Sequence, residues 1–127
     1  MGERARRQLR TALEEAIALL GGDGGFVYLR TSDPGWLAMT MSAGLEQHPS
    51  GRALQRMRLP VNAGLVGVAL RELQVAATGD YETDQRIVRD SQADRFMREA
   101  EAHSLIVAPL LDRAQATGAM GIFAGGR

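Results

Sequence analysis

Apolar side chains recur at steps of three and four along the first twenty residues. The positions concerned are Ala5, Leu9, Ala12, Leu13, Ala16, Ile17 and Leu20. This spacing places them on one stripe of a helix and predicts a helix over residues 3–20. Residues 21–25 follow as four glycines around Asp23. They predict a helix stop and turn rather than a phosphate loop, because they follow a helix and contain no lysine.

Two short runs of β-forming residues come next, at 26–29 and 36–41. Between them, residues 32–35 read Ser-Asp-Pro-Gly, in which proline presets φ and glycine supplies the reversal. We therefore expect an antiparallel hairpin. Neither run has a purely polar face, so we expect this sheet to be covered on both sides.

The middle of the chain has weaker patterns. Residues 44–56, which include two glycines and several polar residues, are predicted to be an irregular loop, and residues 56–61 a short edge strand closed by proline. A shared apolar face predicts a helix over residues 63–73, with Asn62 as its N-cap.

The remaining third alternates strands with one further helix. We expect, in order, a brief strand at 75–78, an irregular segment at 79–88, a helix from a cap at Asp90 or Ser91 to about His103, a strand at 104–111 and a last strand at 119–124. The strand at 104–111 is apolar without interruption, which is typical of a central strand buried on both faces. Strands and helices segregated in this way predict an α+β domain with an antiparallel sheet.

Composition and charge narrow the class of protein. A chain of 127 residues with 45% hydrophobic and 24% charged residues is typical of one globular domain. Fifteen basic and fifteen acidic residues give a formal net charge of zero, which argues against nucleic-acid binding and against a polybasic membrane anchor. Because we find neither a signal-peptide apolar region nor a run of about 20 apolar residues, we expect a cytoplasmic location without membrane contact.

Missing residue types exclude several chemistries. The chain has no cysteine, which removes disulfides, thiolate metal sites, cysteine nucleophiles and thioether-linked chromophores. All fifteen basic residues are arginine, a bias typical of a GC-rich bacterial genome, so no lysine can form a Schiff base. The two histidines, His48 and His103, lie too far apart in sequence to suggest a metal site. We expect no catalytic residues, no metal and no cofactor.

Six segments, in order and over nearly the whole chain, carry a resemblance to a known family. They are Gly24–Leu29, Ser42–Leu45, Leu59–Gly67, Gly79–Tyr81, Ser104–Leu110 and Thr117–Ile122. Together they resemble a GAF domain, the small sensory module of bacterial signalling proteins and phosphodiesterases. The resemblance implies a central antiparallel sheet with helices on both faces. The N-terminal helix would cover one face, and the middle helices and loops would cover the other and could enclose a pocket.

The same resemblance implies a function. It points to a small-molecule-sensing regulatory domain of a bacterial signal-transduction protein, most often a two-component sensor histidine kinase. Many family members carry a further helix after the last strand, where this sequence ends at Arg127, so residues 1–127 are expected to be one domain of a longer chain. A homodimer through the N-terminal helix is expected. The alternative is a ligand-free structural or dimerisation module that relays signals between neighbouring domains.

Family branches with defined chemistry do not match. Free methionine sulfoxide reductases and bilin photoreceptors of this family depend on cysteines, and the cyclic-nucleotide branch resembles an Asn-Lys pattern; this chain has neither cysteine nor lysine. Haem-binding members use a histidine some residues before the central strand. Because His103 stands directly beside Ser104, we expect it at a helix end rather than on haem iron.

The candidate ligand site combines the segment 79–88 with the helix and strand that follow it. The residues concerned are Asp80, Tyr81, Arg86, Phe96, His103 and Ser104. They would set a few polar groups around an apolar wall, which is typical of a small-molecule pocket. The guanidinium fork of Arg86 favours an anionic or carbonyl-bearing ligand. The alternative is an ordinary solvated loop in which Tyr81 packs over the core.

Overall fold

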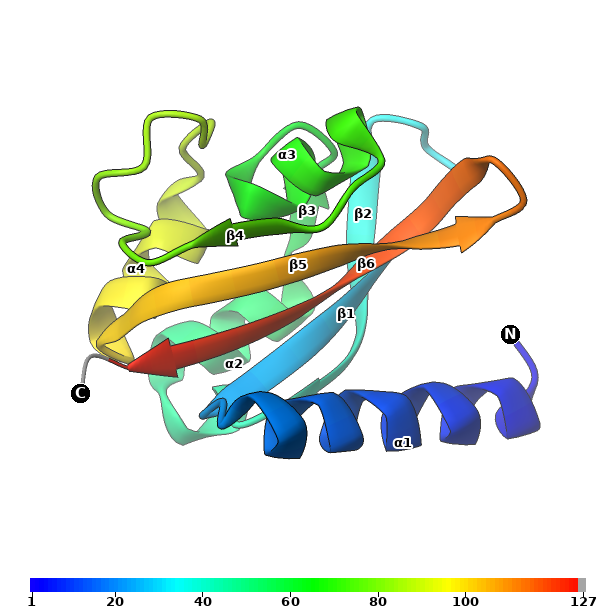
Figure 1. The fold of residues 1–127 in the computed structure, drawn as a ribbon, viewed down its shortest axis with the longest axis horizontal. Helices are drawn as coiled ribbons and strands as arrows, with labels where there is room; N and C mark the ends of the chain where they lie inside the picture. The colour runs from blue at the N-terminus through cyan, green and yellow to red at the C-terminus, as the bar shows by residue number, and fades with distance from the viewer. Residues whose placement is uncertain (126–127) are drawn as a thin grey trace.

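A six-stranded sheet, antiparallel throughout, runs through the molecule in the order β3-β2-β1-β6-β5-β4 (Figure 1). This computed structural model describes residues 1–125 and leaves Gly126 and Arg127, at the end of the sequence, outside the description. The elements are α1 (Glu3–Leu20), β1 (Gly24–Arg30), β2 (Trp36–Ala43), the 3₁₀ turn η1 (Leu45–Gln47), α2 (Pro49–Arg56), β3 (Arg58–Pro60), α3 (Gly64–Glu72), β4 (Ala76–Thr78), α4 (Ser91–Glu99), β5 (Ala102–Asp112) and β6 (Gln115–Gly125). The predicted α+β fold is confirmed.

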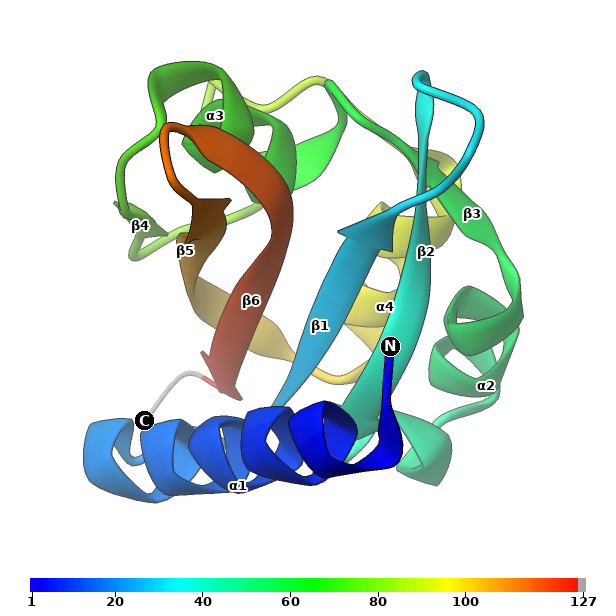
Figure 2. The ribbon, with the colours of Figure 1, turned by 90° about the vertical axis from the view of Figure 1, so that its right-hand side faces the viewer.

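Helices cover both faces of the sheet. Figure 2 shows α1 lying across one face, while α2, α3 and α4 lie on the other. Side chains alternate along each strand, so Phe26 and Tyr28 of β1 join the core beneath the three helices, whereas Val27 joins the core beneath α1. The three-helix side holds the larger of the two cores and is where a pocket was expected.

The helix α1 is fastened to the sheet by one buried side chain and two arginines. Leu13 packs against Val27, Met41 and Ile122 of three different strands. The guanidinium groups of Arg6 and Arg10 donate hydrogen bonds to the carbonyls of Thr40 and Ser42 in β2, at 2.8 and 3.4 Å. The helix ends at Gly21, which has a φ of 66°, so the predicted stop is confirmed.

The irregular loop predicted for residues 44–56 is wrong. This segment forms η1 and then α2, with Pro49 in the first turn of the helix. The buried face of α2 consists of Ser50, Gly51 and Leu54. An added Cβ at Gly51 would collide with the Leu45 carbonyl, so only glycine permits this close approach. Small and polar residues on the buried side hide the apolar period that reveals longer helices.

The two middle helices are confirmed with changed ends. The N-cap of α3 is Ala63 rather than Asn62, and no side chain caps this helix. In α4 the Asp90 carboxylate accepts a hydrogen bond from the Ala93 N–H at 3.0 Å, as expected of a cap. This helix ends at Glu99, however, so the extension to His103 is wrong, and His103 lies in β5.

The strand β5 is buried less completely than predicted. Leu105 and Val107 are buried under the three helices, but Ile106 and Leu110 on the opposite face are only half-buried. The reason is that α1 packs mainly over β1 and β6. A groove of about 1300 Å³ therefore stays open between the first half of α1 and the β5–β6 hairpin. Within residues 1–125, none of the helices combines the length and apolar character that a bilayer span requires.

Candidate functional site

The helices α2, α3 and α4 enclose a small inner cavity against the sheet. Its volume is about 30 Å³. The wall consists of Phe26, Tyr28, Leu54, Leu59, Gly64, Leu65, Val66, Tyr81, Ala93, Phe96, Met97 and Leu105. A space of this size accepts one or two water molecules, whereas drug-sized ligands occupy clefts of about 300–1000 Å³. The cavity is thus in the expected place but is nearly closed.

Two buried tyrosines supply the polar part of this wall. Tyr28 and Tyr81 are each 2% exposed. The pKa of both phenols is raised above the usual value, chiefly by burial and then by the nearby carboxylates of Asp90 and Asp94 respectively. Both hydroxyls therefore stay protonated and can donate hydrogen bonds. Gly64, at the start of α3, has a φ of 65°, and a Cβ there would lie at an ordinary contact distance of 3.5 Å from the Tyr81 hydroxyl.

Arg89 holds the segment 79–90 in place over the cavity. Its Nη2 donates to the carbonyls of Tyr81, Glu82 and Asp84, at 3.0, 2.9 and 3.1 Å. The guanidinium carbon lies 5.4 Å from the centroid of the Tyr81 ring, within the range of a cation–π contact. Nη1 lies 3.6 Å from Oδ1 of Asp94. Arg89 was not among the predicted site residues, since no spacing in the sequence marks it.

Asp94 was also missed. It is a buried acidic residue, 6% exposed, and its Oδ1 has no hydrogen-bond partner among the described residues. The Arg89 guanidinium is the cation nearest to it in the described ion pairs. The helical period could have found Asp94, because it stands one residue after Ala93 and three before Met97, on the inward side of α4.

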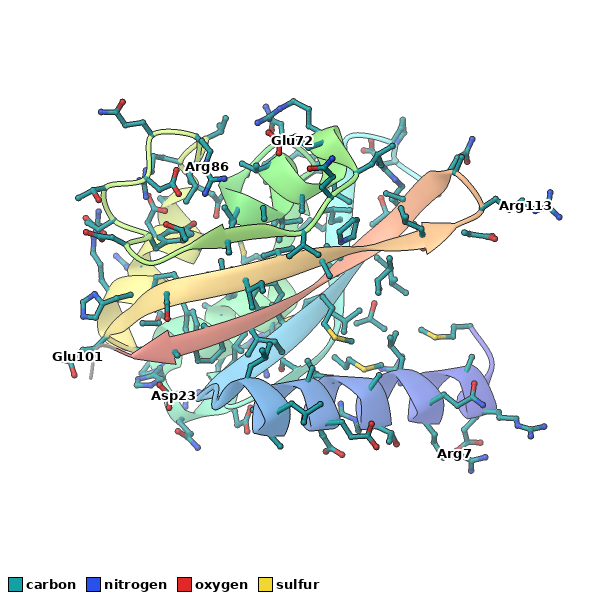
Figure 3. The ribbon with its side chains drawn as sticks, in the orientation of Figure 1. Arg7, Asp23, Glu72, Arg86, Glu101 and Arg113 are labelled. Carbon is teal, nitrogen blue, oxygen red and sulfur yellow. The ribbon has the colours of Figure 1, made fainter. Side chains whose placement is uncertain are left out.

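Of the six predicted ligand residues, two reach the inner cavity. Tyr81 and Phe96 line it. Arg86 is exposed and does not line the cavity, and Figure 3 shows it on the loop far from Glu101 at the other end of α4. Its Nη2 donates to Oδ2 of Asp84 at 2.7 Å and to the Ala77 carbonyl at 2.8 Å. The anion-binding fork expected at Arg86 is thus already occupied.

The other three predicted residues lie outside the cavity. Asp80 is exposed, and its backbone N–H donates a hydrogen bond to the Thr78 hydroxyl at 3.2 Å. The Ser104 hydroxyl donates to the Ala124 carbonyl in the sheet at 3.3 Å. His103 is exposed, but its backbone carbonyl accepts the Tyr81 N–H at 2.8 Å and so anchors the loop.

A second, open depression lies on the outer side of Tyr81. This outer groove has a volume of about 340 Å³ and is lined by Tyr81, Glu82, Met97, Arg98, Glu101, Ala102 and His103. Across it, Arg98 donates to the Glu82 carboxylate from Nε at 3.0 Å and from Nη2 at 2.8 Å. This pairing lowers the pKa of the Glu82 carboxyl. Because both residues line the outer groove, His103 lies near Tyr81, but outside the inner cavity.

A carboxylate clamp joins α2 to α4 beside the inner cavity. Oε1 of Glu99 accepts hydrogen bonds from the N–H and the hydroxyl of Ser50, at 3.1 and 2.9 Å, which lowers the pKa of the Glu99 carboxyl. His48 Nδ1 lies 3.9 Å from the same oxygen. The Ser50 hydroxyl thus donates to a carboxylate rather than to a histidine base. Within residues 1–125, no group of three metal-ligating side chains is close enough to hold an ion.

An antiparallel sheet with one helix on one face and three helices around a small cavity on the other defines an α+β domain. The family model for the GAF domain matches residues 6–127. The chain therefore belongs to the GAF domain family, a family of regulatory modules in signalling proteins, and the resemblance in the sequence is confirmed. No curated protein matches the chain.

Solved structures agree with this fold. The GAF domain from a phosphoenolpyruvate-protein phosphotransferase of Coxiella burnetii is 14% identical, with a TM-score of 0.71, and the match covers 89% of this chain and 62% of that one. The NreA protein of Staphylococcus aureus, mutated in its nitrate binding site, is 12% identical, with a TM-score of 0.71 and coverage of 96% and 86%. Identities this low show the fold alone.

Enzymes are also among the similar structures. The free methionine-R-sulfoxide reductase of Neisseria meningitidis, solved with its substrate, is 18% identical, with a TM-score of 0.66 and coverage of 90% and 59%. The fold thus supports catalysis in some proteins as well as regulation. The chain spans about three fifths of the lengths of the Coxiella and Neisseria chains.

Proposed function

We propose that this chain is a small-molecule-sensing regulatory domain of a bacterial signal-transduction protein, a sensor histidine kinase being the expected parent. The proposed domain is cytoplasmic. Membership of the GAF family supports the regulatory role. The ligand-binding part of this proposal rests on the cavity between the sheet and the helices α2, α3 and α4. This cavity is apolar and is bordered by the buried tyrosines Tyr28 and Tyr81.

Ligand binding at this cavity requires its wall to move, because the closed space is only about 30 Å³. Met97 is the part of the wall best suited to moving, because its unbranched side chain adapts to a new neighbour. The segment 79–90 is held more firmly. Its backbone joins the rest of the domain through the Gly64 N–H to the Val88 carbonyl and the Tyr81 N–H to the His103 carbonyl, and Arg89 bonds three carbonyls within the segment itself.

The proposed domain is non-catalytic. A nucleophilic mechanism needs a serine, cysteine or lysine activated by a neighbouring base. The chain has no cysteine or lysine, and the buried Ser50 hydroxyl donates to Glu99. The sulfoxide reductases of this family depend on cysteine, which this chain lacks.

A ligand-free structural module remains the second candidate. The small volume of the cavity and the position of Arg86 outside its wall favour it. In such a module the three-helix layer would only support the sheet, and no small molecule would stabilise the fold.

A thermal-shift screen of metabolites and nucleotides separates the two candidates. We expect a ligand at 100 times its dissociation constant to stabilise the domain by about 2.7 kcal/mol. For a domain of this length, that corresponds to a rise in Tm on the order of 10 °C. Tyr81→Phe removes only the buried hydroxyl and is expected to reduce the rise, whereas Arg86→Ala, outside the cavity, is the matched control and keeps it. A screen in which no compound moves the Tm of the wild type contradicts the sensing function.

We further propose that α1 binds a second copy of itself in antiparallel orientation. Leu19 is 86% exposed, and Ala5 and Ala12 are exposed on the flank of α1 beside the open groove. Basic residues Arg4 and Arg7 stand in the first half of the helix, and acidic residues Glu14 and Glu15 stand in the second half. An antiparallel pair sets these opposite charges against each other, which favours association in that orientation.

Sedimentation tests this self-association. We expect the wild-type protein to dimerise weakly with rising concentration. Leu19→Asp places a charge in the apolar contact and is expected to leave a monomer with an unchanged Tm. A wild type that stays monomeric at the highest concentration, or a Leu19→Asp variant that dimerises equally well, contradicts the proposed contact.

A further inference from the structure

Tyr81 and Met97 line both the inner cavity and the outer groove. They therefore form the partition between a closed apolar space of about 30 Å³ and an open polar space of about 340 Å³. If this partition opens, the two spaces join into one site of the size that small ligands occupy. The joined site would have an apolar inner end and a charged outer end.

The two residues of the partition are held very differently. Tyr81 is fixed by its N–H bond to the His103 carbonyl and by Arg89, which bonds its carbonyl and lies over its ring. Met97 is held by packing of an unbranched thioether chain with three rotatable bonds, a side chain that adapts easily to a new neighbour. Met97 is thus the side of the partition that can move, and Tyr81 is the fixed side.

Arg98 is the one arginine among the residues that line the outer groove. It stands next to Met97, and its Nε and Nη2 donate to Oε2 and Oε1 of the Glu82 carboxylate, at 3.2 and 2.8 Å. The Arg98 and Glu82 side chains are 62% and 50% exposed. An exposed ion pair is weak, so another carboxylate can replace that of Glu82 at little cost. The planar fork of a guanidinium matches any carboxylate in the same two-bonded geometry.

We propose that the outer groove and the inner cavity together bind a small monocarboxylate with an apolar body. Its carboxylate replaces that of Glu82 on Arg98, and its apolar body passes between Tyr81 and a displaced Met97 into the cavity. Glu82 is then an internal competitor that occupies the carboxylate position while the ligand is absent. This inference rests on the proposed sensing function and names the class of ligand.

The surroundings favour one charge on the ligand, placed at its outer end. The inner wall is made almost entirely of apolar groups, so a second charge on the ligand body would be desolvated without a partner. Glu101 lines the groove as a further acidic residue and would repel a second carboxylate there. A cationic ligand could bind only by separating Glu82 from Arg98 and leaving the Arg98 fork empty.

Three probes of equal chain length test the class directly: hexanoate, hexylamine and 1-hexanol. Binding is followed by calorimetry and by the NMR signal of the Met97 methyl group, which reports the partition itself. We expect hexanoate to bind most tightly and to shift the Met97 signal.

Three variants test the role of the ion pair. Glu82→Gln removes the internal competitor and should lower the dissociation constant of hexanoate several-fold. Arg98→Gln should weaken hexanoate binding by about tenfold or more, because it removes charge-assisted hydrogen bonds. Arg95→Gln, on the same helix but outside the groove, is the matched control and should change nothing.

The outcomes separate this inference from the function on which it rests. Hexanol or hexylamine that shifts the Met97 signal as strongly as hexanoate, or hexanoate that binds Arg98→Gln equally well, overturns the monocarboxylate class but keeps the cavity as a binding site. If none of the three probes shifts the Met97 signal, in the wild type or in Glu82→Gln, the binding site at this partition is overturned as well.

Discussion

Replacing Phe96 with alanine is expected to lower the free energy of unfolding by about 3–5 kcal/mol. Phe96 is 2% exposed and joins α4 to the sheet. Its ring meets the Phe123 ring edge-on at 5.1 Å and the His48 ring at 6.1 Å. Because the ring already borders a small cavity, its removal enlarges an empty space rather than allowing the wall to close. Denaturation in urea measures the loss as a lower midpoint with an unchanged slope.

The neighbouring Arg95 supplies the control for this experiment. It is exposed on the same turn of α4, so Arg95→Ala is expected to change the free energy of unfolding by less than about 0.5 kcal/mol. A Phe96→Ala variant that loses no more than this control would show that α4 does not close the three-helix core. The expected cavity would then have no structural basis.

The second large effect is expected on the opposite face of the sheet. Leu13→Ala should lower the free energy of unfolding by about 2–5 kcal/mol. Leu13 is 0% exposed and is the one buried residue within α1. It touches Val27, Met41 and Ile122, so its loss loosens the helix from β1, β2 and β6 together. Thermal and urea denaturation of the same variant should agree on this loss.

Leu19 provides the matched leucine on the same helix. Since it is 86% exposed, Leu19→Ala is expected to change stability by less than about 0.5 kcal/mol. Equal losses from Leu13→Ala and Leu19→Ala would contradict the orientation of α1. If the wild type dimerises, the comparison must be made at low protein concentration, where association adds nothing to the measured stability.

The sequence predicts well where one physical pattern is long and regular. The helix α1 has the predicted bounds because its apolar stripe persists over 18 residues, and the β1–β2 hairpin follows from a Pro-Gly turn between two apolar runs. The helix α2 was missed because its eight residues bury Ser50 and Gly51, which carry no apolar signal. Likewise, the burial of β5 depends on how far α1 reaches across the sheet, which strand composition does not determine.

The candidate site was predicted in part for a similar reason. Tyr81 and Phe96 reach the cavity because large aromatic side chains near a core become buried. Arginines are different, since their long side chains point wherever the fold offers acceptors. Arg86 bonds to Asp84, Arg89 bonds to carbonyls of its loop, and Arg98 bonds to Glu82. Only the folded loop places these acceptors, so the sequence could not rank the three arginines.

The most direct test of ligand sensing is a crystal structure of the domain at saturating concentration of the strongest compound from the thermal-shift screen. We expect electron density for that compound between Leu65, Tyr81 and Phe96, with the Met97 side chain displaced from its present position. Density for ordered water alone in this cavity, with the compound bound instead in the groove between α1 and the β5–β6 hairpin, would contradict the proposed site.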